Sequence, residues 1–390
     1  LVNGSTGIAV GMASAMPPHN LSEICDAIVA VIDQPEIGLE ELMKLVPGPD
    51  FPTGGSIIGR RGIIEAYATG RGRITLRGKV HHTKDGTRDA IVIDEIPYQV
   101  NQSSLIEKIV ESSREGRISD VADVKNHSGR DAQTRIVVVL RKGADPEVVE
   151  KQLYEYTPLQ SNFSVANIAL VNSQPRTLGL KALLQGYIDH RRQVVRRRTA
   201  YLLRQAKQQA HRLEGLIYAV CDIDEVIRII RQSREREEAI TALMDRGFRI
   251  AAGHRYAPLI PRQVIERTHL VPEGARLTRV QAEAIGAMRL IQLVGLEVEK
   301  LAAEFTKLLE EIEGYEAILA DEKLVLDIIR EDTIELKDKF GDARRTRIEQ
   351  GEAEDFDIEA LITEHDVVVT ISHEGYVKRL PVDTYRTQGR

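Results

Sequence analysis

The residues with the most distinctive chemistry lie near the start of the chain. Within residues 3–12, Gly4, Gly7 and Gly11 are set around a single isoleucine, Ile8. Their spacing is not G-x-G-x-x-G and no Gly-Lys-Ser/Thr follows, which excludes a nucleotide-binding loop. Two interpretations stay open. One is a flexible glycine-rich turn; the other is a close approach to DNA, in which Ile8 acts as a wedge in the minor groove.

A second candidate site is a basic, glycine-rich stretch between residues 59 and 88. Arginine grips phosphate and glycine lets the backbone come close, so this pattern is typical of sequence-independent DNA binding. The alternative is the solvated face of a β-hairpin with no ligand. The basic residues are Arg60, Arg61, Arg71, Arg73, Arg77, Lys79, Lys84 and Arg88, and the glycines are Gly59, Gly62, Gly70, Gly72 and Gly78.

The sequence contains no evident catalytic constellation or metal site. His81 and His82 are neighbours in a predicted strand, so they point to opposite faces and are not expected to ligate one ion. Asp222, Asp224 and Glu225 open a predicted helix, where we expect them to cap it and to complement its dipole. None of the eleven tyrosines has a convincing base partner. We therefore expect any reacting group to lie elsewhere.

Composition sets the broad class of protein. With 390 residues, of which 42% are hydrophobic, the chain can bury the cores of two or three domains. The net charge of −6 gives no overall attraction to a polyanion, so any nucleic-acid surface must be local. Two cysteines are too few for a disulfide framework and favour a reducing, cytoplasmic compartment. No apolar run approaches the roughly 18 residues that span a bilayer.

The first segment, to about Ser173, mixes short elements and is predicted to be an α+β domain. Asn20 and Glu23 have the spacing of a capping box, which opens a helix that ends near Asp33. Alternation over residues 73–81 and 90–96, around a turn at 84–86, predicts a hairpin. Helices are expected at 105–113 and 146–154, and strands at 136–140 and 163–171.

Two long helical arms follow. From Leu180, residues repeat every seven positions and predict a buried seam, while basic residues cover the other faces and no acid occurs between His190 and Leu213. The second arm, residues 301–340, has a 4,3 apolar rhythm and acidic exposed faces. The predicted seam of the first arm consists of Tyr187, Val194, Tyr201, Ile188, Val195 and Leu202.

The opposite charges of the arms indicate how they pair. We expect an antiparallel coiled coil, in which Arg196, Arg197 and Arg198 are available as partners for the acidic arm. A helical insert, about residues 220–296, would sit at its tip, which is a natural place for self-association. A polar linker, residues 341–357, and a hairpin at 367–380 complete the chain, where a further β domain is expected to begin.

Many short stretches, in order along the chain, resemble the A subunits of bacterial DNA gyrase, which are type IIA topoisomerases. The resemblance covers nearly the whole chain. The stretches are residues 3–12 (NGSTGIAVGM), 17–21 (PPHNL), 48–53 (GPDFPT), 59–62 (GRRG), 70–72 (GRG), 95–101 (EIPYQVN), 190–192 (HRR), 340–342 (FGD), 344–345 (RR), 366–370 (DVVVT) and 375–378 (GYVK).

This resemblance implies a domain plan. Residues 1–175 would form an α+β tower domain with a DNA-intercalating loop at its start. Residues 176–348 would form the long antiparallel coiled coil, with an all-α dimerisation globule, the C-gate, at about 220–296. Residues 349–390 would be a linker and the first hairpin of a DNA-wrapping β-pinwheel.

The resemblance also implies roles for residues and partners. Ile8 corresponds to the isoleucine that intercalates into the gate DNA segment and bends it. The catalytic tyrosine and the arginine before it are expected upstream of Leu1, so this part should be inactive alone. Mg²⁺ and ATP belong to the gyrase B subunit, and no cofactor is expected here. The implied partners are double-stranded DNA, a second copy of the chain and the gyrase B subunit.

Some features depart from the family pattern or leave alternatives open. Gln102 stands where a basic residue is often present, and residues 248–276 form a longer stretch than usual. Residues 285–292 depart from the leucine-rich sequence that is usual at this place. The A subunit of topoisomerase IV, a decatenase, is the alternative within the family, because residues 388–390 show only the start of the glycine- and basic-rich gyrase box. A coiled-coil scaffold without a DNA role would explain the heptads but not the basic stretch.

Overall fold

The computed structural model describes residues 1–129, 134–171, 173–251, 253–288, 295–351 and 367–381. The chain divides into two compact units. Unit 1 contains residues 1–187 and 333–390, and unit 2 contains residues 188–332. Predictions that fall on residues 289–292, 352–357 and 388–390 lie outside the described residues. In the described part of the chain, no helix combines the length and apolarity needed to cross a membrane.

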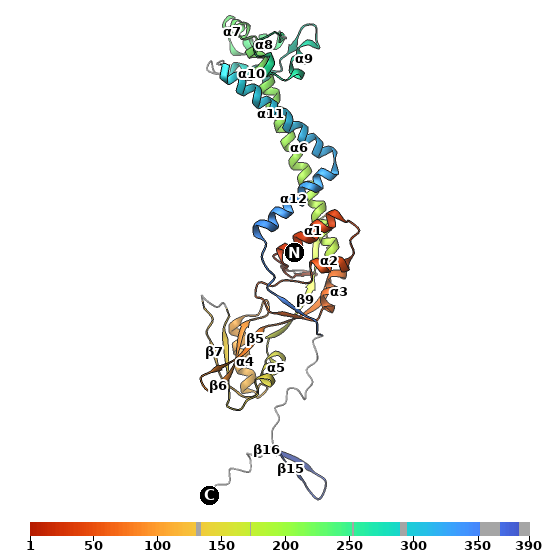
Figure 1. Ribbon diagram of the computed structural model, residues 1–390, viewed down its shortest axis with the longest axis vertical. Coiled ribbons are helices and arrows are strands. Elements are labelled where there is room, and N and C mark those ends of the chain that lie inside the picture. Colours follow the sequence, from red (N-terminus) through yellow and green to blue (C-terminus); the bar gives the residue numbers. More distant parts are fainter. Residues whose placement is uncertain (130–133, 172, 252, 289–294, 352–366, 382–390) are drawn as a thin grey trace. The chain divides into compact units, whose positions relative to one another are not determined.

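The first sheet of unit 1 has six strands in the order β1-β2-β9-β4-β3-β14. The same part of the chain also contains three helices, α1 (Leu21–Asp33), α2 (Leu39–Leu45) and α3 (Arg61–Thr69) (Figure 1). The strands are β1 (Ser5–Ala9), β2 (Met12–Met16), β9 (Gln160–Ala166), β4 (Arg71–Arg77), β3 (Ser56–Ile58) and β14 (Arg347–Glu349). The pairs are antiparallel except β14 with β3, which is parallel.

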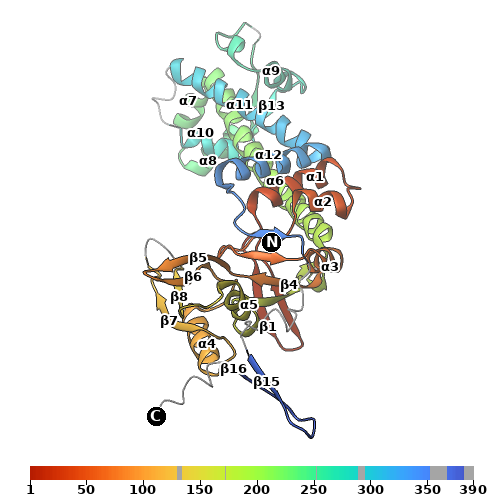
Figure 2. The same ribbon diagram turned by 60° about the horizontal axis from the view of Figure 1, so that its bottom comes forward.

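The second sheet of unit 1 has the order β5-β6-β8-β7 and is antiparallel. Alternate residues of its strands, such as Ile91 and Val138, form one core with Leu105 and Leu153 of helices α4 and α5 (Figure 2). The elements are β5 (Lys79–Asp85), β6 (Arg88–Glu95), β8 (Ile136–Leu140), β7 (Val121–Asn126), α4 (Gln102–Arg114) and α5 (Pro146–Tyr156). The predicted helices and the strand at 136–140 are confirmed.

Two predicted strands are each divided in the structure. The strand expected at 73–81 splits at Gly78 into β4 and β5, which belong to different sheets. A Cβ atom at Gly78 would lie 2.5 Å from Leu159 Cδ1 and 2.6 Å from the Glu95 carbonyl oxygen, so only glycine fits between them. The strand expected at 163–171 ends at Ala166, and β10 (Ile168–Val171) forms a separate hairpin with β11 (Gln174–Thr177).

Unit 1 is closed by the chain that returns after the helical arms. The Arg344 guanidinium donates to both Glu23 carboxylate oxygens, at 2.7 and 2.5 Å, and to the carbonyl oxygens of Gly48 and Pro49, at 2.6 and 2.8 Å. Glu23 therefore binds Arg344 in the structure, whereas the capping-box spacing predicts a role at its own helix terminus. Asn20 does cap α1, because its side chain accepts from the backbone of the first turn.

Neighbouring residues of the returning chain complete this junction. The Asn20 amide donates to the Asp342 carbonyl oxygen at 3.1 Å, and the Asp50 carboxylate accepts from the Thr346 N–H at 2.9 Å. The Phe51 N–H donates to Thr346 Oγ1 at 2.7 Å. The prediction that residues 341–357 form a linker is therefore wrong for the first residues of that stretch. Their backbone is hydrogen-bonded to residues near the start of the chain, and β14 adds a strand to the first sheet.

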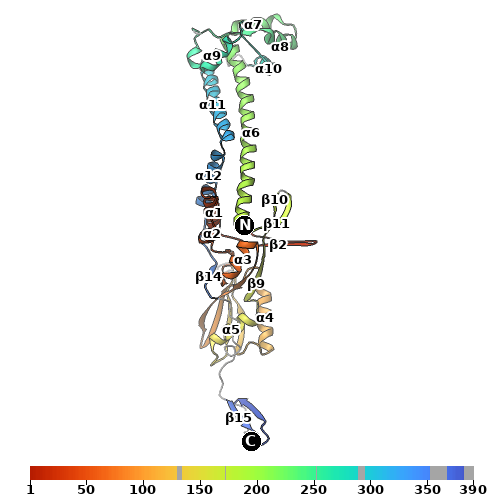
Figure 3. The ribbon, with the colours of Figure 1, turned by 90° about the vertical axis from the view of Figure 1, so that its right-hand side faces the viewer.

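Helix α6 (Leu180–Cys221) pairs with α11 (Gly295–Ala320) and α12 (Glu322–Phe340), as Figure 3 shows; the parts of these helices within residues 188–332 belong to unit 2. Along α6, partner numbers fall as residue numbers rise, so the predicted antiparallel order is confirmed. The polar pairs are Arg191 with Asp332 at 2.8 Å, Arg192 with Glu322 at 3.3 Å, Lys207 with Glu316 at 2.6 Å, and Gln209 with Glu304 at 2.7 Å. The length of α6 is consistent with a coiled coil.

The buried face of α6 differs from the predicted seven-residue seam. The seam is right at Ile188 and Val195, which are buried, but Tyr201 is 54% exposed. The buried face runs instead through Val195, Thr199, Ala206 and Ala210. Their 4,7,4 spacing follows an 11-residue repeat of about 3.67 residues per turn, which stays on one face of a nearly straight helix, while a seven-residue repeat drifts by about 20° per heptad.

The acidic arm is two helices instead of one. α11 ends at Ala320, and the Asp321 side chain accepts from the Lys323 N–H at 2.9 Å at the start of α12. Because aspartate competes with the helical backbone by capping the next turn, it interrupts an otherwise continuous apolar rhythm.

The insert between the arms packs around Phe248, Leu243 and Ile285. The insert is predicted to be all α-helical, but it also contains a short pair of strands. β12 (Gly247–Phe248) pairs with β13 (Ala275–Arg276) at the two ends of the long stretch 248–276. Its helices are α7 (Ile223–Gln232), α8 (Arg236–Asp245), α9 (Arg262–His269) and α10 (Arg279–Gly286), with the short 3₁₀ helix η1 (Ala257–Leu259). The hairpin predicted near the C-terminus is confirmed as β15 (Val367–Ile371) and β16 (Val377–Pro381).

The expected capping of α7 by acidic side chains is wrong in its chemistry. Asp222 occupies the N-cap position but makes no side-chain cap hydrogen bond. Its carboxylate instead accepts from Arg246, which also contacts Glu225 at 2.6 Å. A guanidinium is a stronger partner for a carboxylate than a neutral backbone N–H is.

The Arg344 junction leads to a first prediction. Replacing Arg344 with Ala should lower the free energy of unfolding by about 2 to 3 kcal/mol, because the largely buried Glu23 carboxylate loses its charged partner. The matched control is Arg345→Ala, since the Arg345 side chain is 60% exposed and its contact with Asp342 is 3.6 Å long; this change should cost less than about 0.5 kcal/mol. Urea denaturation followed by circular dichroism measures both, and equal losses would contradict the junction's importance.

Candidate nucleic-acid interface

The glycine-rich segment at the start of the chain forms the β1–β2 hairpin. Gly11 in its turn has φ +83°, and Gly4 at its base has φ +67° with the Met16 carbonyl oxygen 2.9 Å from where a Cβ would lie. Ile8 pairs with Ala13 across the hairpin and is 96% exposed. The segment is therefore neither a nucleotide cradle nor a loose turn. It is a hairpin, β1–β2 (Figure 3), and the Ile8 side chain is exposed to solvent on it.

Strand register relates Ile8 to the basic stretch. One row of paired residues runs from Thr6 through Ala15 and Ala166 to Arg71. Paired residues share a sheet face, as do residues two apart on one strand, so Ile8, Arg71 and Arg73 point to the same side. Three strand spacings put Thr6 and Arg71 about 14 Å apart in this row.

This face differs sharply from the opposite one. It carries polar side chains of β4 and β9, where Thr75 donates to Asn162 at 2.9 Å and Ser164 lies across from Arg73. The alternate residues, such as Ile74 and Phe163, are buried in the core. The first sheet therefore has an apolar side that folds the unit and a basic, polar side that remains accessible.

Arg77 lies on the same strand and the same face as Arg71 and Arg73, but its guanidinium is already bound by other residues of the protein. Its guanidinium donates to Gln160 Oε1 at 2.9 and 2.7 Å and lies 4.6 Å from the centre of the Tyr154 ring. Burial, with the nearby Glu150 carboxylate, raises the pKa of the Tyr154 hydroxyl, so that ring stays neutral beside the arginine. Arg77 is thus held as part of the packing between β4, β9 and α5.

Arg60 and Arg61 lie at the start of α3 and are exposed. A Cβ at Gly72 would lie 2.4 Å from the Gly62 carbonyl oxygen, and one at Gly62 would lie 1.8 Å from the Arg73 carbonyl oxygen. Both glycines are therefore needed where α3 crosses β4 on its core side. The sequence predicts that glycine allows close approach to DNA, but at these positions it allows close packing of helix on strand.

The remaining basic residues do not continue this face. Lys79, Lys84 and Arg88 lie on β5 and β6 of the second sheet, and Lys79 contacts Glu95 at 3.9 Å. The Gln102 side-chain amide donates to Thr134 Oγ1 at 2.7 Å. The basic stretch is one run in sequence but two surfaces in the fold.

Two buried tyrosines and two neighbouring histidines are the side chains that we considered for a catalytic or metal-binding role. Burial raises the pKa of the Tyr67 hydroxyl, and burial with Glu214, which accepts from Tyr218 at 2.8 Å, raises the pKa of Tyr218, so neither ionises readily. His81 lies 2.5 Å from Asp94 and His82 lies 2.6 Å from Glu150, so the two rings contact different carboxylates. In the described ranges, no three His, Cys, Asp or Glu side chains gather as metal ligands.

Comparison with known proteins places the chain among relatives. The family model for the A subunit of DNA gyrase/topoisomerase IV matches residues 1–333. The chain is 43% identical to the DNA gyrase A subunit of Staphylococcus epidermidis strain RP62A and 44% identical to that of Staphylococcus aureus strain MRSA252, with 100% of the chain and 41% of each relative covered. It is 45% identical to the corresponding protein of Halalkalibacterium halodurans, covering 43% of it. The chain thus spans about two fifths of these relatives' length.

The contrast between two arginines of β4 gives a second prediction. Arg77→Ala should lower the free energy of unfolding by about 1 to 2 kcal/mol, because hydrogen bonds to Gln160 and the contact with the Tyr154 ring are lost. Arg73→Ala should change it by less than about 0.5 kcal/mol, since Arg73 is exposed. Thermal and urea unfolding compare the two, and a larger loss for Arg73 would refute this division between packing and accessible residues.

Proposed function

The chain belongs to the family of DNA gyrase/topoisomerase IV A subunits, and from this premise we propose that it is a DNA-binding and dimerising part of a bacterial gyrase A subunit. In this role it bends the DNA segment that the holoenzyme cuts and rejoins, and it contributes an exit gate during ATP-dependent negative supercoiling in the cytoplasm. Relatives named DNA gyrase favour gyrase over topoisomerase IV. Because the chain belongs to this family, the alternative of a coiled-coil scaffold that has no DNA role lacks support.

The observation that carries the proposal is Ile8 on the basic face of the first sheet. An isoleucine that is 96% exposed loses nothing by leaving water, and it gains apolar contact if it enters between base pairs. Arg71 and Arg73 on the same face are exposed and suited to neighbouring phosphates. Arg60 and Arg61 are further candidates for phosphate contacts, while Arg77 supports the face from within.

The chemistry of strand cleavage is assigned to other parts of the holoenzyme. We propose that the tyrosine that forms the link to DNA lies outside residues 1–390, and that Mg²⁺ and ATP are held by the B subunit. The raised pKa values of Tyr67 and Tyr218 make these two of the eleven tyrosines unsuited to attack, because an attacking tyrosine must lose its proton. This part then acts by shaping DNA and by holding two copies together.

The domain roles follow the same proposal. Unit 1 contains the tower domain, assigned to residues 1–175, and the hairpin of residues 367–381 begins a DNA-wrapping pinwheel within residues 349–390. The coiled coil occupies residues 176–348, and its insert, about 220–296, forms the C-gate. Exposed apolar side chains on that insert support self-association, namely Leu259, Leu270, Val271 and Val280.

The wedge is tested by DNA bending. In the full-length A subunit with its B subunit, Ile8→Ala should reduce bending of a duplex labelled at both ends, and should reduce cleavage by about tenfold or more, because the unstacked step loses its apolar support. Leu170→Ala is a control that shortens another exposed apolar side chain, 74% exposed on the β10–β11 hairpin. Unchanged energy transfer for Ile8→Ala would eliminate the wedge role.

Self-association is tested by analytical ultracentrifugation. The chain should sediment at twice its 43.6 kDa mass at micromolar concentration. Val280→Asp should weaken the dimer by at least about tenfold, because a carboxylate is then buried in an apolar contact. Val369→Asp, at an exposed position on β15, is the matched control and should leave the mass unchanged. A monomeric wild-type chain would contradict the C-gate assignment.

A further inference from the structure

Several arginines of α6 are expected from the sequence as partners for the acidic arm but do not serve it. The pairs that join α6 to α11 and α12 use Arg191, Arg192 and Lys207. Arg197, by contrast, is exposed and forms no ion pair with any described residue, and the same is true of Arg196 and Arg198. The charge pattern alone could not separate these two groups.

The helical period separates them. Each residue turns the helix by about 100°, so the buried residues Val195 and Ala206 define one side of α6. Arg197, Tyr201 and Arg204 project from about 150 to 170° around the axis from the centre of that buried side. Gln208 continues the same row. We call Arg197, Tyr201, Arg204, Gln208 and the flanking Arg212 the outer stripe.

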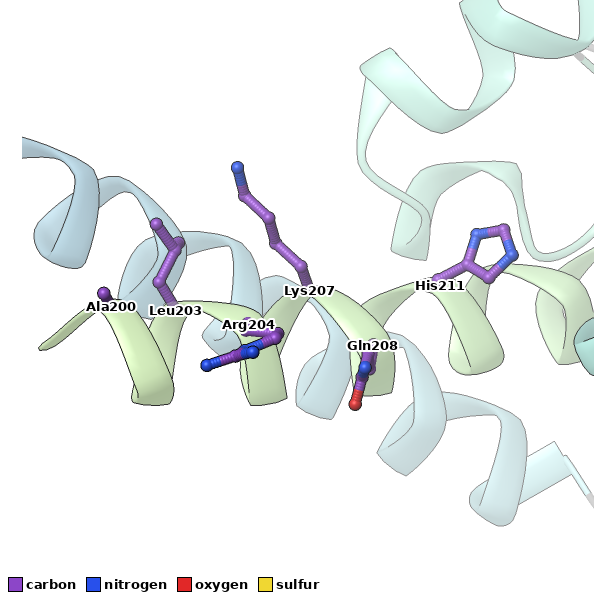
Figure 4. A pocket seen from close by; sticks show the side chains of 6 residues that line it. All are labelled: Ala200, Leu203, Arg204, Lys207, Gln208 and His211. Atoms are coloured by element: carbon purple, nitrogen blue, oxygen red, sulfur yellow. The ribbon is translucent and has the colours of Figure 1, made fainter. Parts of the chain in front are cut away.

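The outer stripe is accessible and uniformly non-acidic. All five of its side chains are exposed, and Tyr201 is unusual in exposing 54% of an aromatic residue. Figure 4 shows Arg204 and Gln208 projecting to one side of α6, away from Lys207, whose ammonium pairs with Glu316. A hollow on the helix surface is lined by both of them, but also by Lys207 and His211, so it is not confined to the stripe. No aspartate or glutamate occurs between His190 and Leu213 to neutralise the stripe.

The chemistry of the stripe selects its partner. A stable protein interface needs about 800 Å² on each side and apolar anchors at its centre, but the stripe offers one helix face with a single aromatic side chain. A polyanion needs only regularly spaced cations and hydrogen-bond donors, which arginine, tyrosine and glutamine supply to phosphate oxygens. The outer stripe therefore fits a nucleic-acid backbone better than it fits a protein surface.

We propose that the outer stripe of α6 is a second, sequence-independent binding surface for a DNA duplex, separate from the basic face of the first sheet. This inference rests on the proposed function, because it assumes a protein that handles DNA. Arg197 and Arg204 are separated by about 10.5 Å along the helix, and Arg204 and Arg212 by about 12 Å. At these separations each guanidinium contacts a different phosphate, so the stripe supplies about three phosphate contacts.

The salt dependence of DNA binding measures those contacts. A triple variant of the whole chain, Arg197→Ala, Arg204→Ala and Arg212→Ala, should reduce the slope of log K against log salt by about 2 to 3, since each phosphate contact contributes about 0.9. The matched control removes three exposed arginines of unit 2 from other positions: Arg196→Ala, Arg231→Ala and Arg236→Ala. It removes the same charge and should leave the slope nearly unchanged. Circular dichroism checks that both variants fold.

Cross-linking locates the duplex independently. A photoreactive benzoylphenylalanine replacing Tyr201 should cross-link to a duplex of about 40 base pairs, long enough to span several helical turns of DNA. The same group replacing the adjacent Leu202, about 100° away around the helix, should not. Cross-linking at position 201 together with the reduced slope supports the outer stripe.

The ways in which this experiment can fail are distinguishable. If the wild-type chain binds DNA and an Arg71→Ala, Arg73→Ala variant weakens binding, but the stripe variant keeps the full slope and position 201 does not cross-link, the outer stripe is wrong and the proposed function stands. An equal loss in the control triple would show general charge attraction and would also overturn the stripe. If the wild-type chain binds no DNA at any salt concentration, the proposed function itself fails.

Discussion

The contact between Arg344 and Glu23 is the constraint on which unit 1 depends. A chain that leaves for a pair of long helical arms must return to the unit it left, and its backbone needs partners there. Arg344 binds one carboxylate and two carbonyl oxygens, and β14 then adds a strand beside β3. Because β3 pairs with β4, this closure supports the sheet that carries Arg71, Arg73 and the Ile8 hairpin.

The basic face exists because the opposite side of the same sheet is packed so closely. Gly62 and Gly72 let α3 lie directly against the backbone of β4, and alternation along the strand then turns Arg71 and Arg73 outward. Arg77 shows the limit of this rule, since it points to the same face yet is bound by Gln160. Packing on one side and charge on the other are therefore coupled, because core residues decide the position of the accessible ones.

Helix α6 divides its charges between two tasks for a comparable reason. Its buried side follows an 11-residue period of small residues such as Thr199 and Ala206, and cations at the margins of that side bind the acidic helices. Arg197 and Arg204 point away from that buried side and form no ion pair with any described residue. A basic helix beside an acidic one thus uses only part of its charge for pairing, and the rest is available to a polyanion.

The sequence by itself determined the family, the mixed α/β character of the first unit, most helices and the antiparallel order of the arms, because these depend on local patterns and on charges with clear partners. It did not separate Arg73 from Arg77, divide the strand at Gly78, place the buried side of α6, or connect Arg344 with Glu23. These features depend on contacts between residues far apart in the chain, such as Leu159 beside Gly78. Only the tertiary structure decided them, because a residue's accessibility and partners are set by what folds against it.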